Sequence, residues 1–170
     1  MTEPNFNRPE WDRDPPDPPF RGRAMRLGAR AGATELGVTM YETDAGGAVS
    51  PYHAHHANEE LLVVLSGRPR LRTPDGSRRL EAGDVVVFPR GPEGAHRISN
   101  PDGPTARVLV CSTMRFPELA EYPDTGTQLA MTGPGEGKTF PAGSDVPFLD
   151  SVMSAMKAGA EREEDPTPEG

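Results

Sequence analysis

The hydrophobic residues of this chain occur in short stretches that turns separate. Residues 35–43 alternate, with Leu36, Val38 and Met40 on one face of an extended chain. The continuous apolar run at residues 61–65 is typical of a buried strand, and residues 85–88 are expected to form another strand after a turn. Because such strands recur about every eight to twelve residues between turns, the pattern predicts an all-β jelly roll or sandwich.

The two ends of the chain differ from its middle. Residues 1–23 hold a run of prolines and aspartates that cannot form a helix or a central strand, so we expect a disordered tail. Trp11 in this tail either anchors it, by docking on the barrel or on a partner subunit, or is an exposed side chain. We expect the barrel itself at residues 24–132.

After the barrel, residues 133–158 are expected to form a C-terminal extension with a short helix from Val146 to Ala158. Its apolar residues share one face and favour packing on the barrel: Phe148, Leu149, Val152, Met153 and Met156. Residues 159–170 are acidic and contain proline, which predicts a second disordered tail.

Composition narrows the classes of partner. The 170 residues include 20 prolines and 19 glycines, and 34% are hydrophobic, which suits one domain with many turns and disordered ends. The net charge of -8 argues against nucleic acid or an anionic membrane as a partner. A single cysteine, with no signal-peptide pattern and no apolar stretch of membrane-spanning length, predicts a cytoplasmic protein.

The four histidines mark the candidate chemistry. His53 and His55 are two residues apart, so they project to the same side of an extended segment. Glu59 and Glu60 follow directly, and His96 could add an imidazole from a distant strand. Imidazole and carboxylate together bind divalent transition metals, and four such donors leave positions open at a six-coordinate ion, as catalysis requires.

The spacing of these residues resembles the two sequence motifs of the cupin superfamily. The first motif is matched by Gly47, His53, His55, Glu60 and Gly67, and counting back from Gly67 selects Glu60 over Glu59. The second motif is matched by Gly83, Pro89, Gly91, His96 and Asn100.

The second motif departs from the family pattern at one point. Four residues, Pro92 to Ala95, separate Gly91 from His96, where the motif has two. Because these residues lie in a loop, we expect them to alter the rim of the pocket more than the metal site.

The resemblance implies a small single-domain cupin, with a double-stranded β-helix (jelly-roll barrel) and one metal ion held by His53, His55, Glu60 and His96. The ion would be Fe, Mn, Ni, Zn or Cu. Iron-dependent oxygenation of a small organic substrate, as by a dioxygenase, is then the first expectation, with isomerase or decarboxylase chemistry next. The resemblance also implies a homodimer.

Other residues and functions stay open at this point. Tyr52, Glu59 and Arg90 are candidates to support the ligands or the substrate, and His56 is expected at the surface or behind the ligands. A non-catalytic module that binds a sugar or another small molecule is the alternative to an enzyme. A structural zinc site is the weakest hypothesis, since such sites are usually closed and rich in cysteine.

Overall fold

The computed structural model describes residues 3–12 and 21–164. The disorder predicted for residues 13–20 and 165–170 lies outside this range. The elements are β1 (Gly22–Met25), α1 (Leu27–Arg30), β2 (Gly37–Thr43), β3 (Gly47–Ala48), β4 (Ala54–His55), β5 (Glu60–Ser66), β6 (Arg70–Thr73), β7 (Gly76–Arg79), β8 (Val85–Phe88), the 3₁₀ helix η1 (Pro92–Gly94), β9 (Arg97–Asn100), β10 (Ala106–Ser112), β11 (Glu118–Tyr122), β12 (Thr127–Gly133), β13 (Glu136–Pro141) and α2 (Phe148–Glu164). The chain divides into two units, Met1–Phe140 and Pro141–Gly170.

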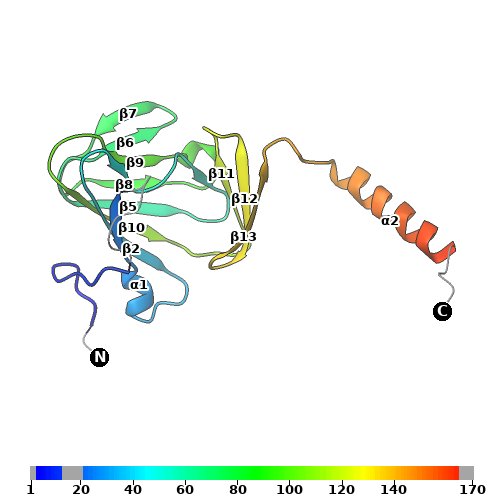
Figure 1. The fold of residues 1–170 in the computed structure, drawn as a ribbon, viewed down its shortest axis with the longest axis horizontal. Coiled ribbons are helices and arrows are strands. Elements are labelled where there is room, and N and C mark those ends of the chain that lie inside the picture. Colours follow the sequence, from blue (N-terminus) through cyan, green and yellow to red (C-terminus); the bar gives the residue numbers. More distant parts are fainter. Residues whose placement is uncertain (1–2, 13–20, 165–170) are drawn as a thin grey trace. The chain divides into compact units, whose positions relative to one another are not determined.

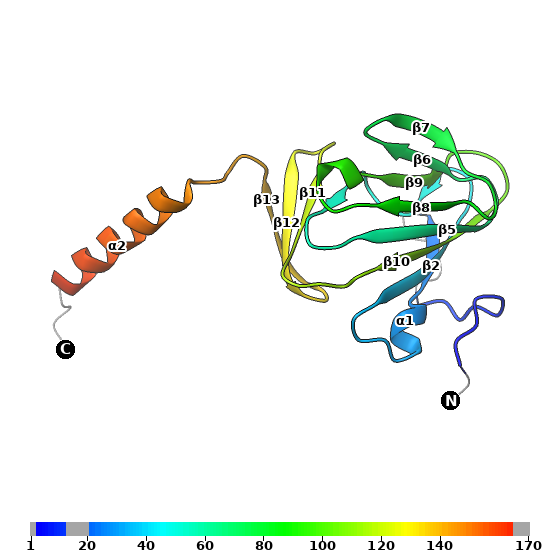
Figure 2. The same cartoon turned by 180° about the vertical axis from the view of Figure 1, so that it is seen from behind.

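The first unit contains three sheets. Every strand pair that we describe within these sheets is antiparallel. Their strand orders are β1-β2-β10-β5-β8, β3-β9-β6-β7 and β13-β12-β11-β4. In both views β11, β12 and β13 run across the strands of the five-stranded sheet (Figures 1 and 2). Several neighbours in these sheets are distant in sequence, as β5 and β10 are, which is the arrangement of a double-stranded β-helix. The predicted fold class is confirmed.

The larger of two apolar clusters forms the main core of the barrel. It consists of Leu62, Val64, Leu71, Leu80, Phe88, Ile98 and Val108, each at most 3% exposed. Strand β5 lies between β10 and β8, so that Leu62 pairs with Val110 on one side and Val86 on the other. The core therefore depends on β5, which also begins at Glu60 of the predicted metal set.

Strands β5 and β8 are buried on only one face, which for residues 61–65 corrects the expectation of a buried strand. In β5 the buried residues alternate, from Glu60 to Leu62 to Val64. In β8 the side chains of Val85 and Val87 are 59% and 51% exposed. Within the described residues of the first unit no layer covers the outer face of these antiparallel strands, so a continuous apolar run did not mean burial on both faces.

Two residues of the motifs, Gly67 and Asn100, shape turns of the barrel. Gly67 has a φ of +79°, and a Cβ atom there would lie 2.7 Å from Ala106 Cα, so both backbone conformation and space require glycine. The amide of Asn100, which is 1% exposed, donates to the carbonyls of Thr43 and Pro104 at 2.9 Å each. Gly67 thus allows a close approach of two backbone segments, and Asn100 binds two backbone carbonyls.

The described part of the N-terminal segment is attached to the barrel. The backbone N–H of Asp12 donates to Ala24 in β1 at 2.8 Å. Its carboxylate accepts from the Arg26 N–H at 2.6 Å and pairs with Arg30 at 2.9 Å. The Arg26 backbone hydrogen bond, with help from Arg30, lowers the pKa of Asp12. Trp11 is partly exposed beside this anchor.

Helix α2 begins two residues later than predicted and ends later, at Glu164. The five apolar residues of its predicted face are exposed by 37–79%. Packing of this helix on the barrel stays a prediction. Among the described residues, no helix is both long and apolar enough to cross a membrane.

We expect Leu62→Ala to lower the free energy of unfolding by about 2–5 kcal/mol, because it leaves a cavity at a side chain with no exposure. Leu36→Ala is the matched control, since Leu36 is 58% exposed and its loss should cost less than about 0.5 kcal/mol. Urea unfolding of both variants measures the difference. Equal losses would contradict the assignment of the core.

Candidate metal site

Two backbone hydrogen bonds bring the two halves of the site together. The N–H of His53 donates to the carbonyl of His96 at 3.1 Å, and the N–H of His96 donates back at 2.8 Å. Strand β4, by contrast, begins only at Ala54. His53 and His96 are thus an isolated antiparallel bridge, and their rings lie 4.6 Å apart between centroids.

Both rings of this bridge are oriented in the same way. Nδ1 of His53 lies 2.9 Å from the carbonyl oxygen of Pro51, and Nδ1 of His96 lies 3.0 Å from that of Gly94. A carbonyl only accepts, so each Nδ1 carries the proton and each Nε2 keeps a lone pair. A metal-binding imidazole typically has this second hydrogen bond.

The four-residue segment between Gly91 and His96 contributes directly to this arrangement. Pro92, Glu93 and Gly94 form the 3₁₀ helix η1, and Gly94 supplies the carbonyl that orients His96. A Cβ atom at residue 94 would lie 1.7 Å from the carbonyl oxygen of Pro89, so only glycine fits. This segment therefore also contacts a ring of the site, while its effect on the rim of the pocket stays a prediction.

Glu60 is the carboxylate that faces the imidazoles. Its Oε2 lies 3.4 Å from His96 Nε2 and 3.6 Å from His55 Nε2. One donor atom each from His53, Glu60 and His96 lies within 4.8 Å of the others, a spacing that one metal ion can bridge. The ring of His55 is 4.8 Å from that of His53, at the edge of the same group.

A second buried carboxylate, Glu118, was missed by the sequence analysis. It is 2% exposed, and its Oε2 lies 3.7 Å from Nδ1 of His55, which has no hydrogen-bond partner. Its Oε1 accepts from the backbone N–H groups of His56 at 3.0 Å and Ala57 at 3.2 Å, and the Asn58 side chain donates to its Oε2. Glu118 therefore holds the loop after His55 and faces that ring from behind.

Burial and charge set the protonation states. Burial, together with the charges of His96 and His55, lowers the pKa of His53 to about 4. Burial alone would raise the pKa of Glu60, but the contact with His96 and the charges of the histidines lower it overall. At neutral pH the site thus presents a neutral His53 and an ionised Glu60, which are the forms that bind metal.

An inner cavity of about 310 Å³ opens beside these donors. His55, Glu60 and Glu118 form part of its wall. The rest of the lining comprises Gly37, Thr39, Tyr41, Asn58, Val110, Ser112, Met114, Phe116, Met131, Pro134 and Gly135. The cavity is near the lower limit for ligand pockets, so it suits a small molecule.

The remaining predicted site residues do not face this cavity. Tyr52 is buried beneath the guanidinium of Arg72, which lies 4.0 Å above its ring. Glu59 is exposed, and its N–H donates to the hydroxyl of Thr113. Arg90 is exposed. His56 is at the surface, with its Nε2 3.2 Å from a carboxylate oxygen of Glu121.

Comparisons with known proteins agree with this architecture. Residues 40–112 match a family model described as Cupin domain. Auxin-binding protein ABP19b of Prunus persica is 33% identical over 72 residues, which are 35% of this chain and only 32% of that protein.

Solved structures match over a longer part of the chain. One from Acidithiobacillus ferrooxidans, named as a candidate sugar phosphate isomerase, has 27% identity and a TM-score of 0.68 over 74% of this chain and 79% of that chain. Another from Silicibacter pomeroyi, a sugar phosphate isomerase from a cupin superfamily, has 25% identity and a TM-score of 0.68, covering 76% and 82%. A conserved barrel domain protein from Salinispora arenicola has 26% identity and a TM-score of 0.50, covering 62% and 85%.

The low pKa of His53 predicts a pH-dependent stability for metal-free protein. An unfolded histidine titrates near pH 6.5, so between about pH 6.5 and 4 the unfolded chain holds a proton that folded His53 lacks. Stability is therefore lost as the pH falls through this window. We expect His53→Gln to reduce the proton uptake on unfolding by about one, measured by urea unfolding with a chelator at several pH values. An unchanged slope would contradict the buried, neutral state of His53.

Proposed function

This chain is a small cupin-domain protein, and we propose that it is a metal-dependent enzyme that isomerises a small hydroxylated substrate. His53, His55, Glu60 and His96 would hold one divalent ion. The observation that carries the proposal is the shared wall of the inner cavity, where His55 and Glu60 of the ligand set face a space for a small molecule.

The donor set suits such an ion. Three imidazoles surround one carboxylate, and two of the rings have their Nδ1 bound to backbone carbonyls, which leaves Nε2 for coordination. Three nitrogens and one oxygen fit Fe, Mn, Ni, Zn or Cu, and availability selects among them. When bound, the ion would act as a Lewis acid that polarises a substrate oxygen.

The chain itself would position the substrate and exclude water. Hydroxyl-bearing residues of β2 and β10, namely Thr39, Tyr41 and Ser112, line the inner cavity and can hydrogen-bond to the oxygens of a polyhydroxylated molecule. Met114, Phe116 and Met131 form an apolar part of the lining. Glu118 acts as a positioning residue, because it faces Nδ1 of His55 and holds the loop that follows it.

Isomerisation is favoured over the other reactions by the solved structures. Two of the structures similar to about three quarters of this chain are named as sugar phosphate isomerases. Oxygenation is the second candidate, because a set of histidines with one carboxylate and open positions also suits iron.

A non-catalytic binding module is the alternative from another class. The curated relative is named for binding, and its matched segment is about a third of its length. A homodimer and a cytoplasmic location stay predictions.

Metal analysis tests the ligand set. We expect about one divalent ion per chain in protein purified without an affinity tag, and at least about tenfold weaker binding after His96→Gln, because a ligand is lost. His56→Gln is the matched control, since His56 lies at the surface beside Glu121. Mass spectrometry of metals and calorimetric titration measure both. An equal loss in the two variants, or no uptake by the wild type, would contradict the site.

Solvent exchange separates isomerisation from the alternatives. The metal-loaded protein should convert members of a panel of aldose and ketose phosphates and incorporate deuterium from D₂O at the carbon beside the carbonyl, followed by NMR. Glu60→Gln should lower the rate by at least about a hundredfold, because it alters a ligand at the cavity wall.

Oxygen consumption with no isomerised product would instead support an oxygenase. Saturable binding with neither reaction would support the binding module.

A further inference from the structure

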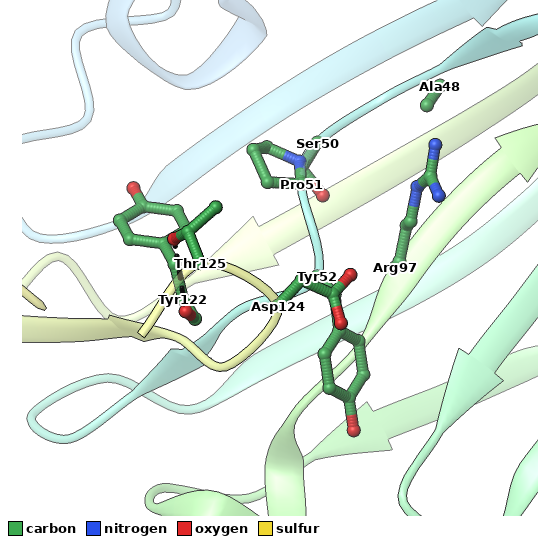
Figure 3. Close-up of a pocket in the computed structure, with 8 residues that line it drawn as sticks. All are labelled: Ala48, Ser50, Pro51, Tyr52, Arg97, Tyr122, Asp124 and Thr125. Atoms are coloured by element: carbon green, nitrogen blue, oxygen red, sulfur yellow. Dashed lines mark hydrogen bonds between the residues drawn. The ribbon is translucent and has the colours of Figure 1, made fainter. Parts of the chain in front are cut away.

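A second cavity, of about 430 Å³, lies outside the metal donors on the other face of the β3-β9-β6-β7 sheet. Leu71 and Ile98 of β6 and β9 point into the core, whereas the next residues along, Arg72 and Arg97, form a cross-strand pair on the opposite face. The turn between β11 and β12 covers this face (Figure 3). The lining residues are Ala48, Ser50, Pro51, Tyr52, Arg97, Tyr122, Asp124 and Thr125.

Contacts of Arg72 hold two parts of the cavity wall in place. Arg72 donates two hydrogen bonds of 2.8 Å to the two oxygens of Asp124. The same guanidinium lies 4.0 Å above the ring of Tyr52. Hydrogen bonding with Arg72 also lowers the pKa of Asp124. One arginine thus holds the β11–β12 turn and a wall of the cavity in place.

Two polar groups of the cavity are left without a partner. The exposed side chain of Arg97 has no hydrogen bond or ion pair within the described part of the chain, although its charge acts on Asp124. The hydroxyl oxygen of Ser50 is buried and has no hydrogen-bond partner. Because unpaired buried polar atoms are uncommon, a hydroxyl of this kind in a cavity wall indicates a ligand that completes it.

The charge balance defines the ligand. Arg72 and Arg97 face one carboxylate, Asp124, so the cavity has one positive charge to spare, which favours a monoanion over a dianion. Tyr122 supplies a flat, mainly apolar surface in the lining. We propose that this cavity is a binding site for a small aromatic carboxylate, with its carboxylate on Arg97 and Ser50 and its ring against Tyr122.

This site does not depend on the proposed metal chemistry. Its link to the donors is Tyr122, whose ring stacks with that of His53 at 6.3 Å between centroids. Figure 3 shows Arg97 across the cavity from Tyr122 and Thr125, so a ring and its carboxylate can span from one wall to the other.

Benzoate is the probe, with benzamide as its neutral counterpart and inorganic phosphate as an anion without a ring. We expect saturable NMR shifts of the amides of Ser50, Arg97 and Tyr122 with benzoate, and at least about tenfold weaker binding of benzamide and phosphate, because each lacks one of the two features. The titration is repeated with a chelator, so that binding to a metal is excluded.

Arg97→Gln should weaken benzoate binding by at least about tenfold, and Ser50→Ala by several-fold. Arg70→Gln is the control, because Arg70 is an exposed arginine on neighbouring β6 outside the cavity, and it should leave binding unchanged. The proposal would be overturned if Arg97→Gln left benzoate binding unchanged, if Arg70→Gln weakened it equally, or if the chelator abolished it. Phosphate binding as tight as that of benzoate would overturn the aromatic part of it.

Discussion

The candidate site depends on one pair of backbone hydrogen bonds, between His53 and His96. These residues are far apart in sequence, and their bridge extends the antiparallel pairing of β3 with β9 to the two rings. Each ring then bonds through Nδ1 to the carbonyl two residues before it, at Pro51 and Gly94. Backbone geometry therefore determines both the distance between the rings and the nitrogen that each presents to Glu60.

The two buried glutamates show how one chemical group can have two roles. Glu60 begins β5, and its carboxylate lies beside Nε2 of His55 and Nε2 of His96, with the charge of His53 also acting on it. Glu118 begins β11 and is surrounded by N–H donors of the loop from His56 to Asn58. Since a buried charge needs a partner, Glu118 is satisfied by the protein, whereas Glu60 is better satisfied by a cation.

Much of the barrel and of the donor cluster could be predicted from sequence, because both depend on spacing. Alternation and turn residues indicate strands, and motif spacing selected His53, Glu60 and His96, which the fold places within reach of each other. Glu118 could not be found this way, because it belongs to no motif and reaches the site only through the β11–β4 pairing. The role of Gly94 was hidden for a related reason: its contribution is a carbonyl oxygen, which every residue has.

The outward face of the barrel was harder to predict from the sequence than its core. An apolar run such as residues 85–88 predicts a strand but does not tell whether its outer face is covered. Tyr52 was considered as support for the metal because it neighbours His53, yet alternation along the chain turns it to the opposite side, under Arg72. Strand β13 extends a sheet past residue 132, where the motifs no longer guide an assignment.

The central claim is that imidazole Nε2 atoms converge on Glu60 to bind a metal ion. The most direct test is the NMR of the histidine ring nitrogens during titration with zinc, which is diamagnetic. The account predicts that Nε2 of His53, His55 and His96 shifts on coordination at about one ion per chain, that Nδ1 of His53 and His96 stays protonated, and that His56 is unaffected. Coordination through Nδ1, or ring nitrogens that do not respond to zinc, would contradict it.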